Sequence, residues 1–299
     1  MDLDPAQLRA LDATVREGTL DRAARALHLT PSAVSQRLRA LEIATGRVLL
    51  VRSKPVQVTE SGAAVLRLAR QIDLLTADTA RELGGATADR PPALPIAVNA
   101  DSMNTWALPA LAPLAAEYAL DLHREDQEHT SALLRAGAVM AAITSEADPV
   151  PGCVVTRLGR MRYRPMAAPA FAERWFPDGA TDEALRRAPV VVFDRKDDLQ
   201  HTYLRRRLGP DADPPAHFVP ASADFLQAIV LGFGWGMVLE LQQPHGQLVD
   251  LDPAGAVDVV LYWQQWKLRS PSLDRVREAI ENAARERLDQ ADNGAATRS

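Results

Sequence analysis

Hydroxyl, amide and guanidinium side chains stand at helical spacing in residues 30–39, TPSAVSQRLR. Val34 and Leu38 lie four residues apart, which predicts a helix that buries one face and turns its polar residues outward. Thr30 is a candidate N-cap, and Pro31 suits the first helical position, where its missing N–H costs nothing. An outward Gln can bond an adenine edge and an outward Arg a guanine edge or a phosphate. The helix therefore has the chemistry to read DNA.

The elements on either side support this interpretation. Residues 20–27, LDRAARAL, place apolar residues at i, i+3, i+4 and i+7, which predicts a short helix just before the polar one. An N-terminal helix precedes it and is expected to end at Gly18, since glycine is favoured just beyond the last helical residue. Residues 46–58 predict a two-stranded wing with Arg52 and Lys54 at its tip. Together these elements predict a winged helix-turn-helix.

The residues expected to contact DNA are the outward residues of the polar helix and the two wing cations: Thr30, Pro31, Ser32, Ser35, Gln36, Arg37, Arg39, Arg52 and Lys54. Ser35 and Gln36 are expected to face the major groove, and the wing cations a phosphate or the minor groove. In the alternative interpretation, Ser32 only supports the helix start and Arg37 is a solvated surface residue. Val48, Leu49 and Leu50 are expected to pack beneath the polar helix.

Composition excludes several classes of protein. The 299 residues are 47 % hydrophobic and 24 % charged, as in an ordinary globular chain. No apolar run approaches the roughly 18 residues of a membrane span, and the acidic start is unlike a secretory signal. The single Cys153 excludes an internal disulfide and fits a reducing cytoplasm, and the six His lack ligand spacing. We therefore expect a cytoplasmic protein with no metal, no cofactor and no membrane partner.

Charge is unevenly divided along the chain. Residues 1–58 carry nine Lys or Arg against six Asp or Glu, whereas the whole chain has a net charge of −5. A small basic head on an acidic body suits a DNA-binding protein. The excess in the head is modest, so the arrangement of residues, rather than charge, carries the DNA prediction.

Residues 59–90 predict a long helix followed by a hinge. Thr59 is a candidate N-cap, and "GGATADRPPALP" has the Gly and Pro content of a flexible connection. The helix carries an apolar seam at 3-4-3 spacing, which we interpret as a dimerisation surface: Val65, Leu68, Ile72 and Leu75. The alternative is a helix that packs on its own domain. Because one head covers one half-site, a dimer predicts a pseudo-palindromic site in double-stranded DNA.

Strands and helices alternate through residues 91–299, which predicts α/β units on mostly parallel sheets. One helix is expected over residues 102–118. Residues 153–169 are expected to pass from one half to the other, and the chain later returns. This excursion predicts two lobes with a cleft between them, lobe I at about 91–163 and 267–290 and lobe II at about 164–266.

From end to end, the chain resembles the LysR-type transcriptional regulators. The motifs are "RAARALHLTPSAVSQRLRALE", "LLVR" and "TESG" in the head and "IAVNADSMNTWALPALAP", "FPDG", "APVVVFDRKDD" and "LYWQQW" in the body. The body motifs are similar to the branch that controls lysine and arginine export, also described as inhibitors of chromosome initiation. The resemblance implies a winged helix-turn-helix, a linker-helix dimer or tetramer, and an α/β effector domain like a periplasmic binding protein. One departure is "LGFGWGMVLELQ", which ends in Leu-Glu-Leu where a proline turn is expected.

Ligands of open α/β sheets lie beyond the carboxyl ends of the strands, where this chain is polar and partly acidic. Hydroxyls there can bind an amino acid's carboxylate, carboxylates can bind its cationic groups, and a Trp can cover its stem. The candidate effector-binding residues are Asp101, Ser102, Thr105, Trp106, Asp126, Thr144, Asp194 and Asp224. In the alternative interpretation several of the acids, Asp101 and Asp224 among them, are helix N-caps.

The resulting prediction is a DNA-binding activator that senses lysine, arginine or histidine, controls a basic amino-acid exporter gene and assists RNA polymerase. The alternative is a ligand-independent DNA-architectural or replication-initiation-inhibiting protein. An enzyme is not expected, because no nucleophile elbow or P-loop occurs and "GFGWG" follows a predicted helix rather than a strand.

Overall fold

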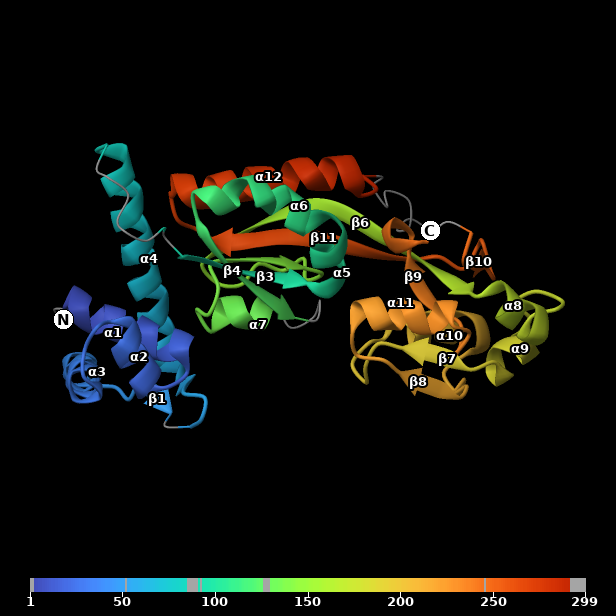
Figure 1. Cartoon of the computed structure of the whole chain (residues 1–299), viewed down its shortest axis with the longest axis horizontal. Helices are drawn as coiled ribbons and strands as arrows, with labels where there is room; N and C mark the ends of the chain where they lie inside the picture. Colours follow the sequence, from blue (N-terminus) through green and yellow to red (C-terminus); the bar gives the residue numbers. More distant parts are fainter. Residues whose placement is uncertain are drawn as a thin grey trace, which may run out of the picture. The chain divides into compact units, whose positions relative to one another are not determined.

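The computed structural model describes residues 3–51, 53–84, 91, 93–125, 130–244 and 246–290. They form two compact units. Unit 1 comprises Met1–Asn99, Leu111–Thr156 and Trp263–Ile280, and unit 2 comprises Ala100–Ala110, Arg157–Tyr262 and Glu281–Ser299. Unit 1 thus contains the N-terminal helices, the long helix α4 and one α/β lobe, and unit 2 contains the other lobe (Figure 1). Across the described residues, no helix has the length and apolar character needed to cross a bilayer.

The head is the predicted winged helix-turn-helix. Its elements are α1 (Pro5–Glu17), α2 (Leu20–Ala26), α3 (Pro31–Thr45), β1 (Leu50–Val51) and β2 (Gln57–Val58), the two strands pairing antiparallel. Val34 and Leu38 of α3 are buried as their spacing predicts, and they share one core with Leu49. The expectation for Val48 is wrong, because its side chain is 66 % exposed. Successive side chains of an extended segment point in opposite directions, so Val48 turns outward where Leu49 turns inward.

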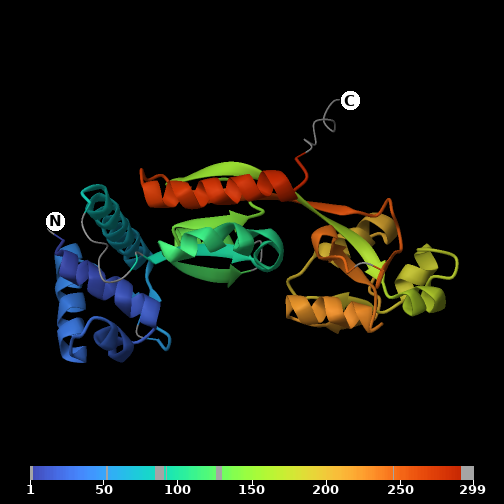
Figure 2. The same cartoon turned by 45° about the horizontal axis from the view of Figure 1, so that its top comes forward.

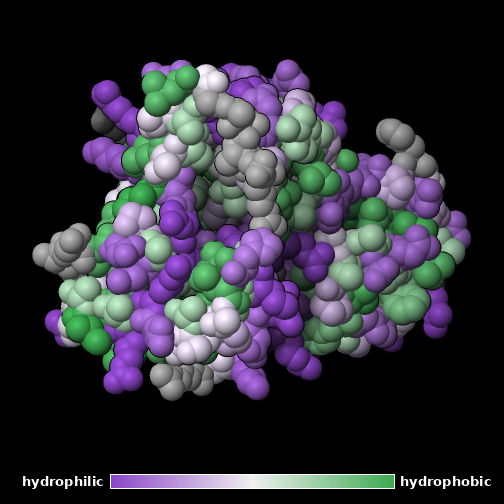
Figure 3. Space-filling model, turned by 60° about the vertical axis from the view of Figure 1, so that its left-hand side comes forward, coloured by the Kyte–Doolittle hydropathy of each residue, from purple (hydrophilic) through white to green (hydrophobic). Residues whose placement is uncertain are grey.

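Helix α4 (Glu60–Glu82) follows the wing directly, and its N-cap Thr59 accepts a hydrogen bond from the Gly62 backbone N–H at 3.0 Å. Val65 and Ile72 pack partly against the core of the head, whereas Leu68 and Leu75 are each 37 % exposed. Figure 3 brings the head side forward and shows apolar residues in small groups among hydrophilic ones. The predicted seam is therefore divided between the chain's own core and the surface.

The α/β lobe of unit 1 contains three parallel strands in the order β5 (Ala141–Thr144), β3 (Ala93–Asn99), β4 (Ala119–Glu125). Helix α7 (Thr130–Arg135) lies on one side of these strands and α12 (Pro271–Arg287) on the other (Figure 1), and Figure 2 shows α12, in red, running along its side of the sheet. Parallel strands need both faces covered, which agrees with the fully buried β5.

The helix expected over residues 102–118 is broken into four short segments. These are α5 (Ala100–Ser102), a π-helical turn (Met103–Ala107), α6 (Leu108–Leu111) and a 3₁₀ turn (Ala112–Ala116). Pro109 and Pro113 lack the N–H groups that a continuous helix would use, so the hydrogen-bond pattern changes around them. The prediction of one continuous helix is therefore wrong.

Two long strands, β6 (Cys153–Ala167) and β11 (Val257–Trp266), belong partly to each unit, and the sheet runs β10-β6-β11-β5-β3-β4. In unit 2, β9 (Gly236–Leu239) and β10 (Val249–Asp250) pair antiparallel with β6. A separate parallel pair is formed by β7 (Val190–Val192) and β8 (Ala216–Phe218).

Four helices complete the described part of unit 2: α8 (Pro169–Trp175), α9 (Asp182–Arg187), α10 (Leu199–Leu208) and α11 (Ser222–Val230). Helix α10 was not expected from the sequence. Its buried residues are Gln200, Tyr203 and Leu204, so its inward face includes a polar residue and gives little hydrophobic periodicity.

The turn between α2 and α3 contains one residue in the left-handed region. His28 has φ 54°, and its side chain is exposed. A residue with a Cβ pays roughly 1–2 kcal/mol for this conformation, whereas glycine adopts it freely.

We expect His28→Gly to raise the melting temperature of the head by about 2 °C or more, less than the full strain energy because glycine also loses more backbone entropy on folding. His28→Ala, which keeps the Cβ, is the control and should bring no gain. Thermal unfolding followed by circular dichroism measures both. A Gly variant less stable than the Ala variant would show that the turn is not strained.

Candidate DNA-reading face and effector pocket

Helix α3 presents the predicted DNA-reading residues on one surface. Thr30 caps the helix by accepting a hydrogen bond from the Ala33 backbone N–H at 3.2 Å. The exposed residues of the predicted set are Thr30, Pro31, Ser32, Ser35, Gln36, Arg39 and Lys54. Arg37 is half-buried, and Arg52 lies outside the described residues.

The N-terminal turn of α3 adds its own polarity to this surface. The first N–H groups of a helix lack partners within the helix and carry the positive end of its dipole. Gln36 and Arg39, three residues apart, extend the same exposed surface by one turn. The arrangement suits insertion of α3 into a major groove with its N-terminal turn beside phosphate or a base edge.

A small cavity lies in unit 2, with a volume of about 40 Å³. Its polar lining residues are Asp101, Tyr163, Asp197, Gln200, Ser222 and Gln242. Phe193, Phe225 and Met237 contribute to its apolar wall. Segments that are far apart in the sequence thus converge on one site: α5, β6, the loop before α10, and α11.

Two carboxyl groups of this cavity are held in an environment that disfavours their charge. Burial raises the pKa of Asp101, and the Tyr163 hydroxyl, which donates to Asp101 Oδ2 at 2.7 Å, offsets only part of the increase. Burial also raises the pKa of Asp197, despite the backbone N–H of Leu199 at 3.0 Å, and the charge of Asp101 adds to the increase. A bound cation would offset the free-energy cost of ionising both carboxylates.

Polar atoms without hydrogen-bond partners beside these acids also favour a ligand that carries hydrogen-bond donors. Gln200 is 1 % exposed, and its Oε1 has no hydrogen-bond partner in the described chain. The Oγ of Ser222, a residue 9 % exposed, also lacks one within the residues described. Buried polar atoms are nearly always hydrogen-bonded, so exceptions that line a cavity mark a place where a ligand can supply donors.

The other predicted effector residues that the structure describes do not line this cavity. Thr105 donates its hydroxyl to the Asp101 carbonyl at 2.7 Å, and Trp106 is 2 % exposed in the core. Ser102 is buried near Met161, with 3.8 Å between Oγ and Sδ, and Thr144 accepts from the Glu146 N–H at 3.1 Å.

Asp194 and Asp224, two further acids of the predicted set, also lie away from the cavity lining. Asp224 is exposed in the first turn of α11, whose N-cap is Ala221, so Asp224 does not cap that helix. Asp194 accepts hydrogen bonds from the backbone N–H groups of Lys196 and Asp197 at 2.7 and 3.1 Å. Asp126 lies outside the described residues.

Of the polar cavity residues, the sequence predicted only Asp101, and it missed Tyr163, Asp197, Gln200, Ser222 and Gln242. Asp194 directly follows the predicted strand and drew attention, but its side chain closes the turn that carries Asp197 inward. The sequence did contain a signal, which is Asp197, the second acid in "FDRKDD". An Asp at the start of such a turn accepts hydrogen bonds from the neighbouring backbone, so a later acid is the better candidate for a cavity residue.

Comparison with known proteins identifies the chain's relatives. The family description "Bacterial regulatory helix-turn-helix protein, lysR family" matches residues 5–63, and "LysR substrate binding domain" matches residues 90–285. The chain belongs to the LysR family of transcriptional regulators. It is therefore a DNA-binding regulator, as the sequence predicts, and its relatives are regulators rather than enzymes.

The similarity extends over nearly the whole chain. The transcriptional regulator LysG of Mycobacterium tuberculosis is 43 % identical over 286 residues, covering 94 % of each chain. The lysine export transcriptional regulatory protein LysG of Corynebacterium glutamicum is 41 % identical over 293 residues, covering 96 % of this chain and 99 % of the relative.

Solved structures of the same group confirm the fold. The crystal structure of ArgP from Mycobacterium tuberculosis has a TM-score of 0.83 and 42 % identity, and the match covers 97 % of this chain and 100 % of that one. Full-length LysG from Corynebacterium glutamicum with bound effector Arg has a TM-score of 0.74 and 40 % identity, with 96 % and 99 % coverage. The predicted winged helix-turn-helix and two-lobed α/β effector domain are thereby confirmed.

Gln36 and Lys54 should have distinct effects on DNA binding. With duplexes selected from a random pool by the wild-type chain, we expect Gln36→Ala to lose about tenfold or more of the preference over scrambled duplexes. Lys54→Ala should weaken binding to both kinds alike and reduce the salt slope by about one. Fluorescence anisotropy at several salt concentrations measures both effects. Arg187→Ala, an exposed cation of unit 2, is the control, and unchanged discrimination by Gln36→Ala would contradict the base-reading role.

Asp197→Asn should stabilise the chain without ligand. Because the folded pKa lies above the ordinary 3.8, ionisation of Asp197 lowers stability at neutral pH, and this loss disappears as the pH falls through the raised pKa toward 3.8. The Asp197→Asn variant should therefore melt a few degrees higher at about pH 7, with the gap closing in acid. Thermal melts across pH measure this. Asp198→Asn is the matched control, because the Arg205 guanidinium lowers the pKa of Asp198. A melting temperature of Asp197→Asn below that of the wild type at neutral pH would contradict this prediction.

Proposed function

We propose that this regulator senses a basic amino acid (arginine, lysine or histidine) and controls a gene for a basic amino-acid exporter. The observation that carries the sensing half is the half-buried pair Asp101 and Asp197, which lines one small cavity and whose pKa values are raised by desolvation. Two desolvated carboxylates favour a cationic ligand and disfavour an anion or an apolar group.

The size of the cavity suits a terminal charged group rather than a whole amino acid. Its volume of about 40 Å³ corresponds to roughly three water-sized groups. A guanidinium offers five N–H donors and an ammonium three, which match the carboxylates of Asp101 and Asp197 and the free Oε1 of Gln200. Phe193 and Phe225 line the same cavity, and their rings suit the flat face of a guanidinium.

Leucine is the informative comparison, because it has a similar stem and no charge. Its side chain would leave both desolvated carboxylates without a cation and the Gln200 Oε1 without a donor. Such unpaired groups cost more than an apolar side chain gains from burial in so small a space. The cavity therefore discriminates by charge.

The regulatory half of the proposal is supported by the relatives. LysG of Corynebacterium glutamicum carries the name of a lysine export regulator, and full-length LysG of the same organism was solved with arginine bound as its effector. We infer that the chain acts as a dimer through the α4 seam, on which Leu68 and Leu75 are exposed, so that two heads bind a pseudo-palindromic site. Effector binding then shifts the population of conformers and the access of RNA polymerase to the promoter.

Calorimetric titration of the full chain with arginine, lysine, histidine and leucine tests the sensing half. We expect at least one basic amino acid to bind, with leucine silent. Affinity should fall as the pH is lowered into the acid range, because protons compete with the cation for carboxylates whose pKa values are raised.

Variants then locate the site. Asp101→Asn and Asp197→Asn should each weaken binding by about tenfold or more, because each leaves the cation short of a carboxylate. Asp198→Asn, on the exposed side of the same loop, should bind as the wild type does. Failure of all three basic amino acids to bind would overturn the proposal and favour a ligand-independent architectural protein.

A further inference from the structure

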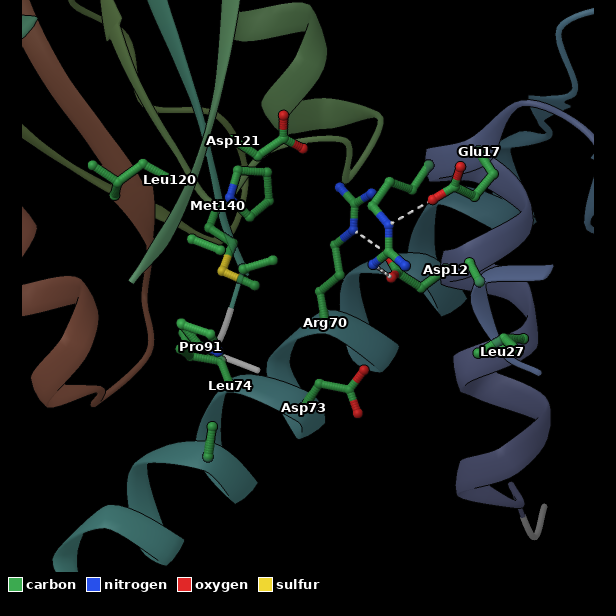
Figure 4. Close-up of a pocket in the computed structure, with 16 residues that line it drawn as sticks. Asp12, Glu17, Leu27, Arg70, Asp73, Leu74, Pro91, Leu120, Asp121 and Met140 are labelled. Carbon is green, nitrogen blue, oxygen red and sulfur yellow. Dashed lines mark hydrogen bonds and ion pairs between the residues drawn. The ribbon is translucent and has the colours of Figure 1, made fainter. Parts of the chain in front are cut away.

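One arginine of α4 joins the head to the effector lobe of unit 1. Arg70 is 8 % exposed, and its Nε donates to Asp12 Oδ1 of α1 at 2.7 Å. Its Nη1 donates to the Gly137 carbonyl at 2.8 Å and also to the Ala138 carbonyl. Figure 4 shows the Arg70 side chain rising from α4 toward Asp12. The guanidinium thus contacts the first helix of the head and the loop after α7 at the same time.

The space beside this contact is open. A cavity of about 580 Å³ is lined by α1, α4 and the strands of the lobe, and Arg70 is part of its wall. Figure 4 shows Asp12 and Glu17 on the head side and Asp121 and Met140 on the lobe side. Where head and lobe face each other across this cavity, Arg70 supplies a polar link in place of close side-chain packing.

The loop that Arg70 contacts is itself docked closely on α4. Gly137 has φ 68°, and a Cβ there would lie 2.9 Å from the Ala63 carbonyl oxygen and 3.3 Å from the Arg67 backbone nitrogen. A side chain at this position would therefore be strained and would push the loop away from the helix. The loop leads directly into β5, and Met140 N–H donates to the Pro95 carbonyl of β3 at 2.8 Å. A shift of either strand would displace the carbonyls that Arg70 holds.

A second polar contact joins α4 to the same lobe near the C-terminal end of the helix. Asp78, 7 % exposed, accepts from the Ser270 hydroxyl at 2.5 Å and from the Ser272 hydroxyl. Arg81 Nη1 also donates to Ser272 Oγ, at 2.8 Å. Helix α4 is therefore held to the lobe at two levels, whereas Arg70 alone among these residues also contacts α1.

The buried position of Arg70 makes the link sensitive to rearrangement. A buried guanidinium that loses one partner keeps its desolvation penalty, so partial separation is unfavourable and the contact is made or broken as a whole. Lysine cannot replace it, because one ammonium lacks the forked geometry that reaches a carboxylate and two carbonyls together.

We propose that Arg70 is the coupling residue that sets the orientation of the DNA-reading head relative to the effector lobe of unit 1, and that effector binding changes this orientation through the loop at Gly137 and Ala138. The second half rests on the proposed function. The first half concerns the chain without ligand and stands independently of it.

The test measures an intramolecular distance. Nitroxide labels are placed at Arg25→Cys on α2 and Ala116→Cys on the lobe, both exposed positions, in a Cys153→Ser background. Double electron–electron resonance is recorded on the full-length labelled chain diluted with unlabelled chain. Arg70→Gln removes the link, Gly137→Ala displaces the loop, and Arg70→Lys is the conservative variant. Arg16→Gln is the matched control, because Arg16 binds the same Asp12 at 3.1 Å from an exposed position.

Without ligand, we expect one narrow distance for the wild type and the Arg16→Gln control. Arg70→Gln and Gly137→Ala should broaden the distribution about twofold or more, with Arg70→Lys between them. Equal widths in all variants that remain folded by circular dichroism would overturn the proposal. If Arg70→Gln does not fold, the Gly137→Ala and Arg70→Lys chains decide the question.

Adding arginine separates this inference from the proposed function. In a wild type that binds arginine by calorimetry, the distance should shift, and in Arg70→Gln the shift should be lost while arginine affinity is retained. A shift of the same size in Arg70→Gln would refute the coupling role. If the wild type binds no arginine, the proposed function fails, and the ligand-free distances still decide whether Arg70 orients the head.

Discussion

Close approach of backbone to α4 is the constraint on which the arrangement of unit 1 depends. A Cβ at Gly62 would lie 1.9 Å from the Leu49 carbonyl oxygen, and one at Gly137 would lie 2.9 Å from the Ala63 carbonyl oxygen. The wing of the head and a loop of the effector lobe therefore meet the same short stretch of helix, which no larger side chain allows. Arg70, two turns beyond Gly62, reaches both parts because this packing brings them within one side-chain length.

Buried charges are treated differently in the two units. In unit 1, Arg70 and Asp78 are buried with charged and polar partners at hydrogen-bonding distance, as a stable core requires. In unit 2, Asp101 and Asp197 are half-buried with hydroxyl and amide donors but with no cation bonded to them in the described chain, and their pKa values are raised. The first arrangement stabilises the fold. The second lowers stability in the absence of ligand, which makes these acids candidates for ligand binding.

The arginines of β6 show that not every cationic cluster is a nucleic-acid surface. Arg162 makes two hydrogen bonds to Asp258, at 2.8 and 2.9 Å, and Arg164 is paired with Asp250 and Glu240. Alternate residues of a strand lie on one face, so these arginines form a row matched by acids from β11, β10 and the segment after β9. Acids of the body thus neutralise these two arginines, whereas Arg39 of α3 and Lys54 of the wing turn are exposed.

Local rules were sufficient for much of the fold. The caps at Thr30 and Thr59 and the inward face of α3 follow from spacing and side-chain chemistry within a few residues. They failed for α10, which buries Gln200 in place of an apolar residue because distant segments pack over it. The break after β3 is different, because Pro109 and Pro113 cause it locally and the sequence already contained that signal.

For the candidate site, the sequence by itself determined the head, its polar helix and the presence of acids after the strands, because periodicity and capping act locally. Only the tertiary structure decided which acid lines the cavity. Asp194 and Asp197 are three residues apart and chemically identical, yet one closes a turn and the other lines a cavity with Asp101. Burial depends on which distant segments pack over a side chain, and that information lies in the packing of the whole unit rather than in any short stretch.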